Sequence, residues 1–92
     1  MSYEWDPEKA AANLKKHKVD FADAVVALED ENALTIEEPG HNEQRFITLG
    51  MGSYLNVLYV VHACRERDTI RIISARKANK QEIKQYYQGL ST

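Results

Sequence analysis

Residues 54–76, YLNVLYVVHACRERDTIRIISAR, decide the fold because they hold two β-rich segments separated by a short charged turn. The segment 54–64 is rich in Val and Tyr and is nearly apolar on both faces, which is typical of a central strand. Residues 65–68, RERD, read as a charged hairpin tip, and residues 69–76 read as the next strand. This stretch therefore predicts an antiparallel hairpin at the centre of a sheet.

Two further strands are expected before this hairpin. Residues 33–38, ALTIEE, alternate between apolar and polar side chains, as a half-buried strand does. Pro39-Gly40 then starts a loop, and residues 45–52, RFITLGMG, form the next strand. Because the later strands follow one another through short polar turns, the pattern predicts a four-stranded antiparallel meander.

Helices flank these strands on both sides in the sequence. Asp6-Pro7 begins a helix, with Asp6 as the cap and Pro7 in the first turn, and we expect it to end near residues 16–18. Asp20 caps a second helix. That helix has an apolar stripe at helical spacing, formed by Phe21, Ala24, Val25 and Leu28.

The last helix has the clearest start signal. Asn79 is a good N-cap, and Glu82 three residues later completes a capping box. Its apolar stripe consists of Ile83, Tyr86, Tyr87 and Leu90. Two helices, four strands and one helix predict an α+β fold, with the helices packed on an antiparallel sheet in a single domain over residues 1–92.

The composition, 43% apolar and 28% charged, is that of an ordinary soluble globular protein. The single Cys64 cannot form an internal disulfide, which fits a reducing cytosol, and we expect a cytoplasmic protein. The longest apolar run, residues 57–61, is too short to span a membrane, and the N-terminus has no signal-peptide pattern. There is no Gly-rich phosphate loop, no metal-ligand spacing and no Gly-x-Ser-x-Gly motif, so we expect neither a cofactor nor a metal site.

The net charge of −2 hides a division between the two halves of the chain. Residues 1–44 hold four Lys and eleven acidic residues, whereas residues 45–92 hold eight Lys and Arg and three acidic residues. This asymmetry is compatible with an RNA or acidic partner for the basic half, and also with two solvated faces of opposite charge.

Several basic side chains lie at the ends of predicted elements. Lys16 and His17 can complement the dipole of the first helix, or can bind a phosphate and exchange a proton. Arg45 shares a face with Ile47, Leu49 and Met51 by alternation, and its head either reaches water or faces a phosphate.

The strand 69–76 ends in a basic segment, ARK. Alternation predicts that Ile70, Ile72, Ser74 and Arg76 share the core face, and that Arg71 lies solvated on the other face. An arginine that begins on the core side needs a partner, and Glu82 or a bound phosphate can provide it.

One histidine and two tyrosines have a structural interpretation as well as a functional one. His62 lies between apolar neighbours, where a hydrogen-bonded core histidine is more common than a catalyst. Tyr86 and Tyr87 can stack on an RNA base, although their helical spacing favours the core for both.

Three pieces of the sequence together closely resemble the BrnT toxin family: Glu4-Trp5-Asp6, the pattern Asn-x-x-Lys-His ending at His17, and Ile-Ser-Ala-Arg-Lys-Ala at residues 73–78. The resemblance runs from Tyr3 to about Tyr87. It implies a RelE-like fold and a ribonuclease toxin of a type II toxin–antitoxin system that arrests translation. It also implies a BrnA antitoxin with a ribbon-helix-helix part, in a hetero-oligomeric complex that binds its own operator DNA.

The family's polar motif positions correspond here to Lys16, His17, Arg45, Arg76 and Glu82. We expect the two arginines to stabilise the phosphate and Lys16 to assist there or to hold the RNA backbone. His17 is then the general acid or base, and Glu82 is the base or orients Arg76. Further RNA contacts are expected from Arg71, Lys77 and Tyr86. The family commonly has Gly where this chain has Lys18.

The expected reaction is metal-free RNA cleavage, in which the 2′-hydroxyl attacks the adjacent phosphate with acid–base and electrostatic help. Two other functions use the same basic half. One is a non-catalytic RNA-binding or regulatory module, and the other is an interaction protein that only docks an acidic antitoxin segment.

Overall fold

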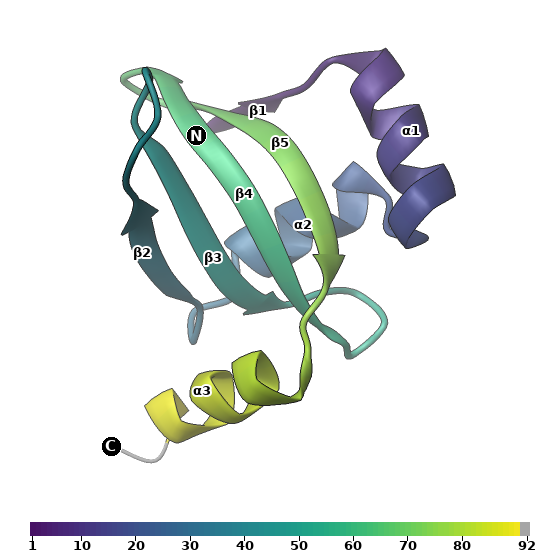
Figure 1. The fold of residues 1–92 in the computed structure, drawn as a ribbon, viewed down its shortest axis with the longest axis vertical. Helices are drawn as coiled ribbons and strands as arrows, with labels where there is room; N and C mark the ends of the chain where they lie inside the picture. The colour runs from purple at the N-terminus through teal and green to yellow at the C-terminus, as the bar shows by residue number, and fades with distance from the viewer. Residues whose placement is uncertain (91–92) are drawn as a thin grey trace.

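Five strands form one sheet, in the order β1-β5-β4-β3-β2, in the computed structural model, which describes residues 1–90 (Figure 1). The elements are β1 (Ser2–Glu4), α1 (Pro7–His17), α2 (Phe21–Leu28), β2 (Leu34–Glu38), β3 (Arg45–Met51), β4 (Val57–Glu66), β5 (Thr69–Lys77) and α3 (Lys80–Leu90). Residues 91–92 of the expected domain and the side chain of Leu90 lie outside the described part. The predicted α+β class and the order of helices are confirmed.

The expected strand number was wrong, because β1 adds a fifth strand to the sheet. It pairs with β5 in parallel, with Tyr3 opposite Ile70, and the backbone N–H of Ser2 donates to the carbonyl of Asp68 at 2.8 Å. The other three strand pairs are antiparallel, as predicted. A strand of three residues is too short to show a two-residue period, so its sequence carried no signal.

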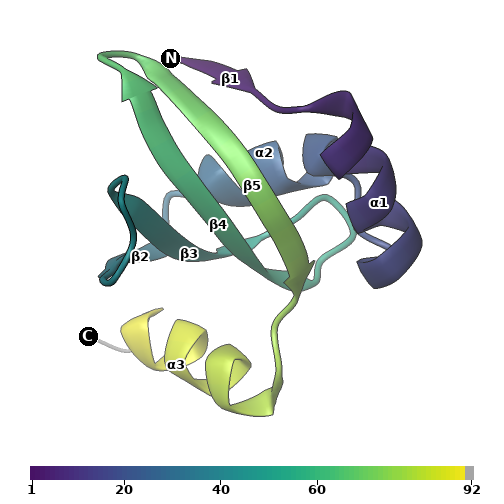
Figure 2. The ribbon, with the colours of Figure 1, turned by 45° about the horizontal axis from the view of Figure 1, so that its top comes forward.

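The two faces of the sheet are covered by different helices. Leu58 and Val60 of β4 pack in the cluster that contains Phe21 of α2, whereas Val57 and Tyr59 pack with Tyr86 of α3. Successive side chains of a strand point to opposite faces, so α2 and α3 lie on opposite sides of the sheet. Figure 2 shows this arrangement, with α1 on the same side as α2.

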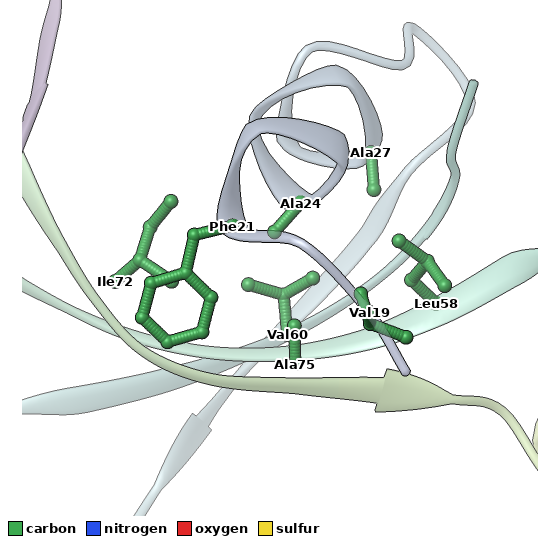
Figure 3. Close-up of a cluster of buried hydrophobic side chains, with 8 residues drawn as sticks. All are labelled: Val19, Phe21, Ala24, Ala27, Leu58, Val60, Ile72 and Ala75. Atoms are coloured by element: carbon green, nitrogen blue, oxygen red, sulfur yellow. The ribbon is translucent and has the colours of Figure 1, made fainter. Parts of the chain in front are cut away.

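The larger core cluster lies between α2 and strands β4 and β5 (Figure 3). It contains Val19, Phe21, Ala24, Ala27, Leu58, Val60, Ile72 and Ala75. The small alanines allow α2 to approach the sheet so closely that a Cβ on Gly50 would lie 2.1 Å from the carbonyl oxygen of Ala27. Gly50 is therefore a packing residue.

A bulge in β5 changes which residues share a face. His62 pairs with Ile72, but the neighbouring Val61 pairs with Ser74, so Ile73 has no partner of its own. Ile72 and Ala75 both lie in the α2 cluster, and Ser74 and Arg76 consequently face the α3 side. The predicted common face of Ile72 and Arg76 was therefore wrong.

The predicted helix caps are confirmed. The side chain of Asp6 accepts from the N–H of Glu8 at 2.8 Å, and that of Asp20 accepts from the N–H of Ala22 at 3.0 Å. Lys18 ends α1 in the left-handed region, with φ 61°, where an L side chain is strained and Gly is not. Among residues 1–90, no helix is long and apolar enough to span a membrane.

Candidate functional site

The Arg76–Glu82 pair joins the end of β5 to the start of α3. The Nη1 and Nη2 atoms of Arg76 donate to the two carboxylate oxygens of Glu82 at 2.9 and 3.0 Å, a bidentate pair. The guanidinium carbon also lies 3.8 Å from the centre of the Tyr59 ring. Glu82 at the same time accepts from the N–H of Asn79 at 2.9 Å, and Asn79 accepts from the N–H of Glu82, which confirms the capping box.

This pairing stabilises the charged forms of both side chains. The hydrogen bond from Arg76 lowers the pKa of Glu82, although partial burial acts in the opposite direction. The hydrogen bond to Glu82 likewise raises the pKa of Arg76 against the effect of burial. Both terminal nitrogens of Arg76 are thus occupied by a carboxylate that is itself held by the helix cap.

The same helix is fixed to the sheet by Tyr86. Its ring is 2% exposed, and its hydroxyl donates to Asp30 at 2.5 Å. Burial and this hydrogen bond raise the pKa of Tyr86 to about 12, and the hydrogen bonds from Tyr86, Asn32 and Met51 lower the pKa of Asp30 although burial opposes them. The buried ring of Tyr86 has no face open to an RNA base, so the structure does not support the RNA contact expected of it. Tyr87 is about half exposed and packs edge-on against Tyr86.

A second basic cluster lies on the α3 side of the sheet, at the opposite end of β4. Arg45 of β3 and Arg71 of β5 both pair with Ala63 of β4, so their side chains project from one face. One carboxylate oxygen of Glu43 accepts a hydrogen bond from Nη2 of Arg71 and lies 3.7 Å from Nε of Arg45. Arg71 lies on the face opposite Ile70 and Ile72, as predicted, but it is not solvated because it pairs with Glu43, which the sequence did not single out.

These two arginines have unused donors. The guanidinium of Arg45 makes no hydrogen bond among the described residues, and the Nε atoms of both Arg45 and Arg71 are buried without an acceptor. Their side chains are nevertheless 31% and 27% exposed, so the terminal nitrogens remain near the surface. This cluster differs from the Arg76–Glu82 pair in having more donors than acceptors.

An apolar hollow of about 270 Å³ lies on this face beside α3. Ile36, Ile47 and Tyr59 of the sheet line it, together with Glu82 of α3. Tyr59 pairs with Arg76, and Ala63 of the same strand pairs with Arg45 and Arg71. Four residues of strand correspond to roughly 13 Å, so the two arginine groups lie about that far apart on one face.

Lys16 and His17 do not join either group. They end α1, which contacts β5 on the α2 side of the sheet and is attached there by Asn13. The amide of Asn13 donates to the carbonyl of Ala75 at 2.8 Å and accepts from its N–H at 3.1 Å, and so satisfies the free edge of β5. The Asn-x-x-Lys-His pattern from Asn13 to His17 is therefore explained in part by this edge contact. Among residues 1–90, no hydrogen bond or ion pair connects Lys16 or His17 to Arg45, Arg76 or Glu82.

Lys77 and His62 also point to the α2 side. Lys77 is exposed and lines a shallow hollow with Lys18 and Leu58. His62 is 6% exposed, with Nε2 2.8 Å from the hydroxyl of Thr48, and burial lowers its pKa to about 4. This is the hydrogen-bonded core histidine that the sequence favoured. No group of three or more His, Cys, Asp or Glu side chains in the described chain could hold a metal ion.

Comparisons with known proteins give a consistent result. Residues 5–82 match the family described as the ribonuclease toxin, BrnT, of type II toxin–antitoxin systems. The structure is similar to the crystal structure of the Brucella abortus ribonuclease toxin, BrnT, with a TM-score of 0.66 and 26% sequence identity over 87% of this chain and 99% of that one. A comparison with curated protein sequences gives no significant match.

Proposed function

Because the chain belongs to the BrnT family of type II toxin–antitoxin ribonuclease toxins, we propose that it cleaves RNA by attack of the 2′-hydroxyl on the adjacent phosphate, without a metal ion. Translation is inhibited as a result, and a BrnA-like ribbon-helix-helix antitoxin neutralises the toxin. The toxin acts in the cytoplasm, where its RNA substrate is, and the complex binds operator DNA through the antitoxin.

One observation supports this reaction above the others: Arg45 and Arg71 project side by side from one face with unfilled hydrogen-bond donors. A phosphate gains negative charge on its equatorial oxygens as the 2′-oxygen attacks, and arginine forks stabilise that charge best. We therefore place the reacting phosphate at the terminal nitrogens of Arg45 and Arg71. Glu43 shares a single carboxylate oxygen between the two side chains and so ties them to one another.

Arg76 has a different place in this proposal. Its terminal nitrogens already bind Glu82, so it reaches a phosphate only if that pair opens. We assign it to the RNA backbone flanking the reacting phosphate, across the apolar hollow from Arg45. Lys16, His17 and Lys77 lie on the α2 side; the first two remain predictions as catalytic residues, and Lys77 remains a prediction as an RNA contact.

The test is incubation of the purified chain with single-stranded RNA in the presence of EDTA. We expect cleavage that persists in EDTA, stops when the 2′-hydroxyl at the cut position is replaced by hydrogen, and stops when the purified antitoxin is added. RNA that is bound but left intact would instead identify a non-catalytic module. Cleavage of the 2′-deoxy substrate, or loss of activity in EDTA that added Mg²⁺ restores, would contradict the proposed mechanism.

A further inference from the structure

We infer that the loop between β2 and β3 supplies the proton-transfer group of this ribonuclease: His41 acts as the general base, and Glu38 holds its imidazole. This inference rests on the proposed function, since it names the residues that serve the phosphate held by Arg45 and Arg71. It assigns a role to two side chains that the sequence motifs left out.

The geometry of the hairpin brings the imidazole to the arginine cluster. Nε2 of His41 contacts a carboxylate oxygen of Glu38, the last residue of β2. Glu38 pairs with Arg45, the first residue of β3, and side chains that pair in this way lie roughly 5 Å apart at Cβ. Glu43 of the same loop bridges Arg45 and Arg71. The loop therefore carries a histidine–carboxylate pair and an arginine-holding carboxylate to the same end of the sheet.

The histidine is held in the orientation that a general base needs. An ionised carboxylate can only accept a hydrogen bond, so Nε2 of His41 carries the proton that Glu38 accepts. The lone pair of Nδ1 is then available to take a proton, which is the relation between base and orienting carboxylate in catalytic triads. The side chain of His41 is 34% exposed, so a substrate can reach it.

The other two histidines of the chain are placed less favourably. His62 is buried on the α2 face, with Nε2 bound to Thr48. His17 ends α1 on the α2 side, away from Arg45 and Arg71. Glu38 is the charged group that contacts His41, and the charged groups of the neighbouring cluster are Glu43 from the same hairpin, Arg45 from β3 and Arg71 from β5.

The 2′-O–H proton passes to Nδ1 of His41, the 2′-oxygen forms a bond to phosphorus, and the bond from phosphorus to the 5′-oxygen breaks. The 5′-oxygen leaves with a proton from water, and the products are a 2′,3′-cyclic phosphate and a 5′-hydroxyl. His41 returns its proton to solvent. Arg45 and Arg71 stabilise the negative charge on the phosphate oxygens throughout the reaction.

The test compares variants on a labelled single-stranded RNA, with kcat and KM measured between pH 5 and 9. We expect His41→Ala to lower kcat by about 10²–10⁴-fold with little change in KM, to lose the acidic limb of the pH profile, and to recover in part with added imidazole. Glu38→Gln should lower kcat less and shift that limb. Asn42→Ala in the same loop and Glu37→Gln on the opposite face of β2 are the matched controls, and both should behave as wild type.

These measurements distinguish a ribonuclease that uses another base from a chain that does not cleave RNA. A His41→Ala protein that is folded, by thermal unfolding, and keeps the wild-type kcat and pH profile would overturn the inference while the ribonuclease stands. The inference would also be overturned if His17→Ala, and not His41→Ala, lost the acidic limb of the pH profile and recovered with added imidazole. A wild-type chain that leaves RNA intact would overturn the proposed function, and this inference with it.

Discussion

Two arginine groups on one face of the sheet differ in how completely their charges are matched. Arg76 forms a bidentate pair with Glu82, six residues further along the chain, and Glu82 also takes part in the capping box of α3. Arg45 and Arg71 share one oxygen of Glu43, and their Nε atoms have no acceptor. A charge that is already paired contributes to stability, whereas unused donors on an exposed face are available to a ligand. The first group therefore reads as a structural pair, and the second as a binding site.

The largest expected effect tests the second group. Arg45→Ala should lower the rate of RNA cleavage by about 10²–10³-fold, because it removes a donor from the charge that develops on the phosphate. The free energy of unfolding should change little, since Arg45 makes no hydrogen bond in the described chain. Arg45→Lys should recover only part of the rate, because an ammonium lacks the planar fork.

The control for this variant is Arg67→Ala, at the exposed tip between β4 and β5. Arg67→Ala changes the net charge of the chain as much as Arg45→Ala does, but it leaves Arg45 and Arg71 intact. We therefore expect it to cleave RNA at the wild-type rate. If Arg76→Ala lost more activity than Arg45→Ala while both remained folded, the division between the two groups would be reversed.

The next effect tests the first group through stability. Arg76→Ala should lower the free energy of unfolding by about 1–2 kcal/mol, below the value for a fully buried pair because the side chain is 35% exposed. The loss comes from leaving Glu82 without its partner and from removing the contact with Tyr59. Urea unfolding of Arg76→Ala, Glu82→Gln and the double variant measures the coupling between the two residues. Lys84→Ala, on the exposed side of α3, is the control, and additive changes would show that the pair does not hold the helix.

The pH dependence of stability isolates part of that effect. The pKa of Glu82 is lowered in the fold by Arg76, so its contribution is present above its ordinary pKa of 4.5 and is lost as pH falls through the folded value. Stability of the wild type should thus fall more steeply below pH 4.5 than that of Glu82→Gln. His62, whose pKa is lowered to about 4, makes stability fall between pH 6.5 and 4 in both proteins, so it cancels in the difference. If the free energy of unfolding fell equally steeply below pH 4.5 in the wild type and in Glu82→Gln, the Arg76–Glu82 pair would not contribute to stability.

The difference between the groups also explains what the sequence could and could not predict. Arg76, Asn79 and Glu82 are close in the chain, and the helix cap and the arginine pair follow from local rules that the structure confirms. The helices, the antiparallel strands and the buried His62 follow from periodicity in the same way.

The Arg45 cluster depends on information that no local pattern contains. Glu43 and Arg71 are 28 residues apart, and they meet because the pairing of β3, β4 and β5 sets both Arg45 and Arg71 opposite Ala63. A bulge is likewise a property of the register between two strands, so alternation along β5 alone placed Arg76, beyond the bulge, on the wrong face. His17 was favoured over His41 for a similar reason, because its motif was visible in the sequence and its position in space was not.

The smallest expected effect compares the two carboxylates directly. Glu43→Gln should change the free energy of unfolding by no more than about 0.5 kcal/mol, because the side chain is 40% exposed and surface ion pairs contribute little. Removal of its charge also removes an internal competitor for the phosphate, so the KM for RNA should fall, and by more than in Glu82→Gln, because Arg76 contacts only the flanking backbone. Urea unfolding and steady-state cleavage of the two variants measure both quantities, and Glu31→Gln, exposed beyond α2, is the control. A Glu43→Gln protein as destabilised as Glu82→Gln would mean that the Arg45 cluster is held as firmly as the Arg76 pair, and that its unused donors are a feature of the fold alone.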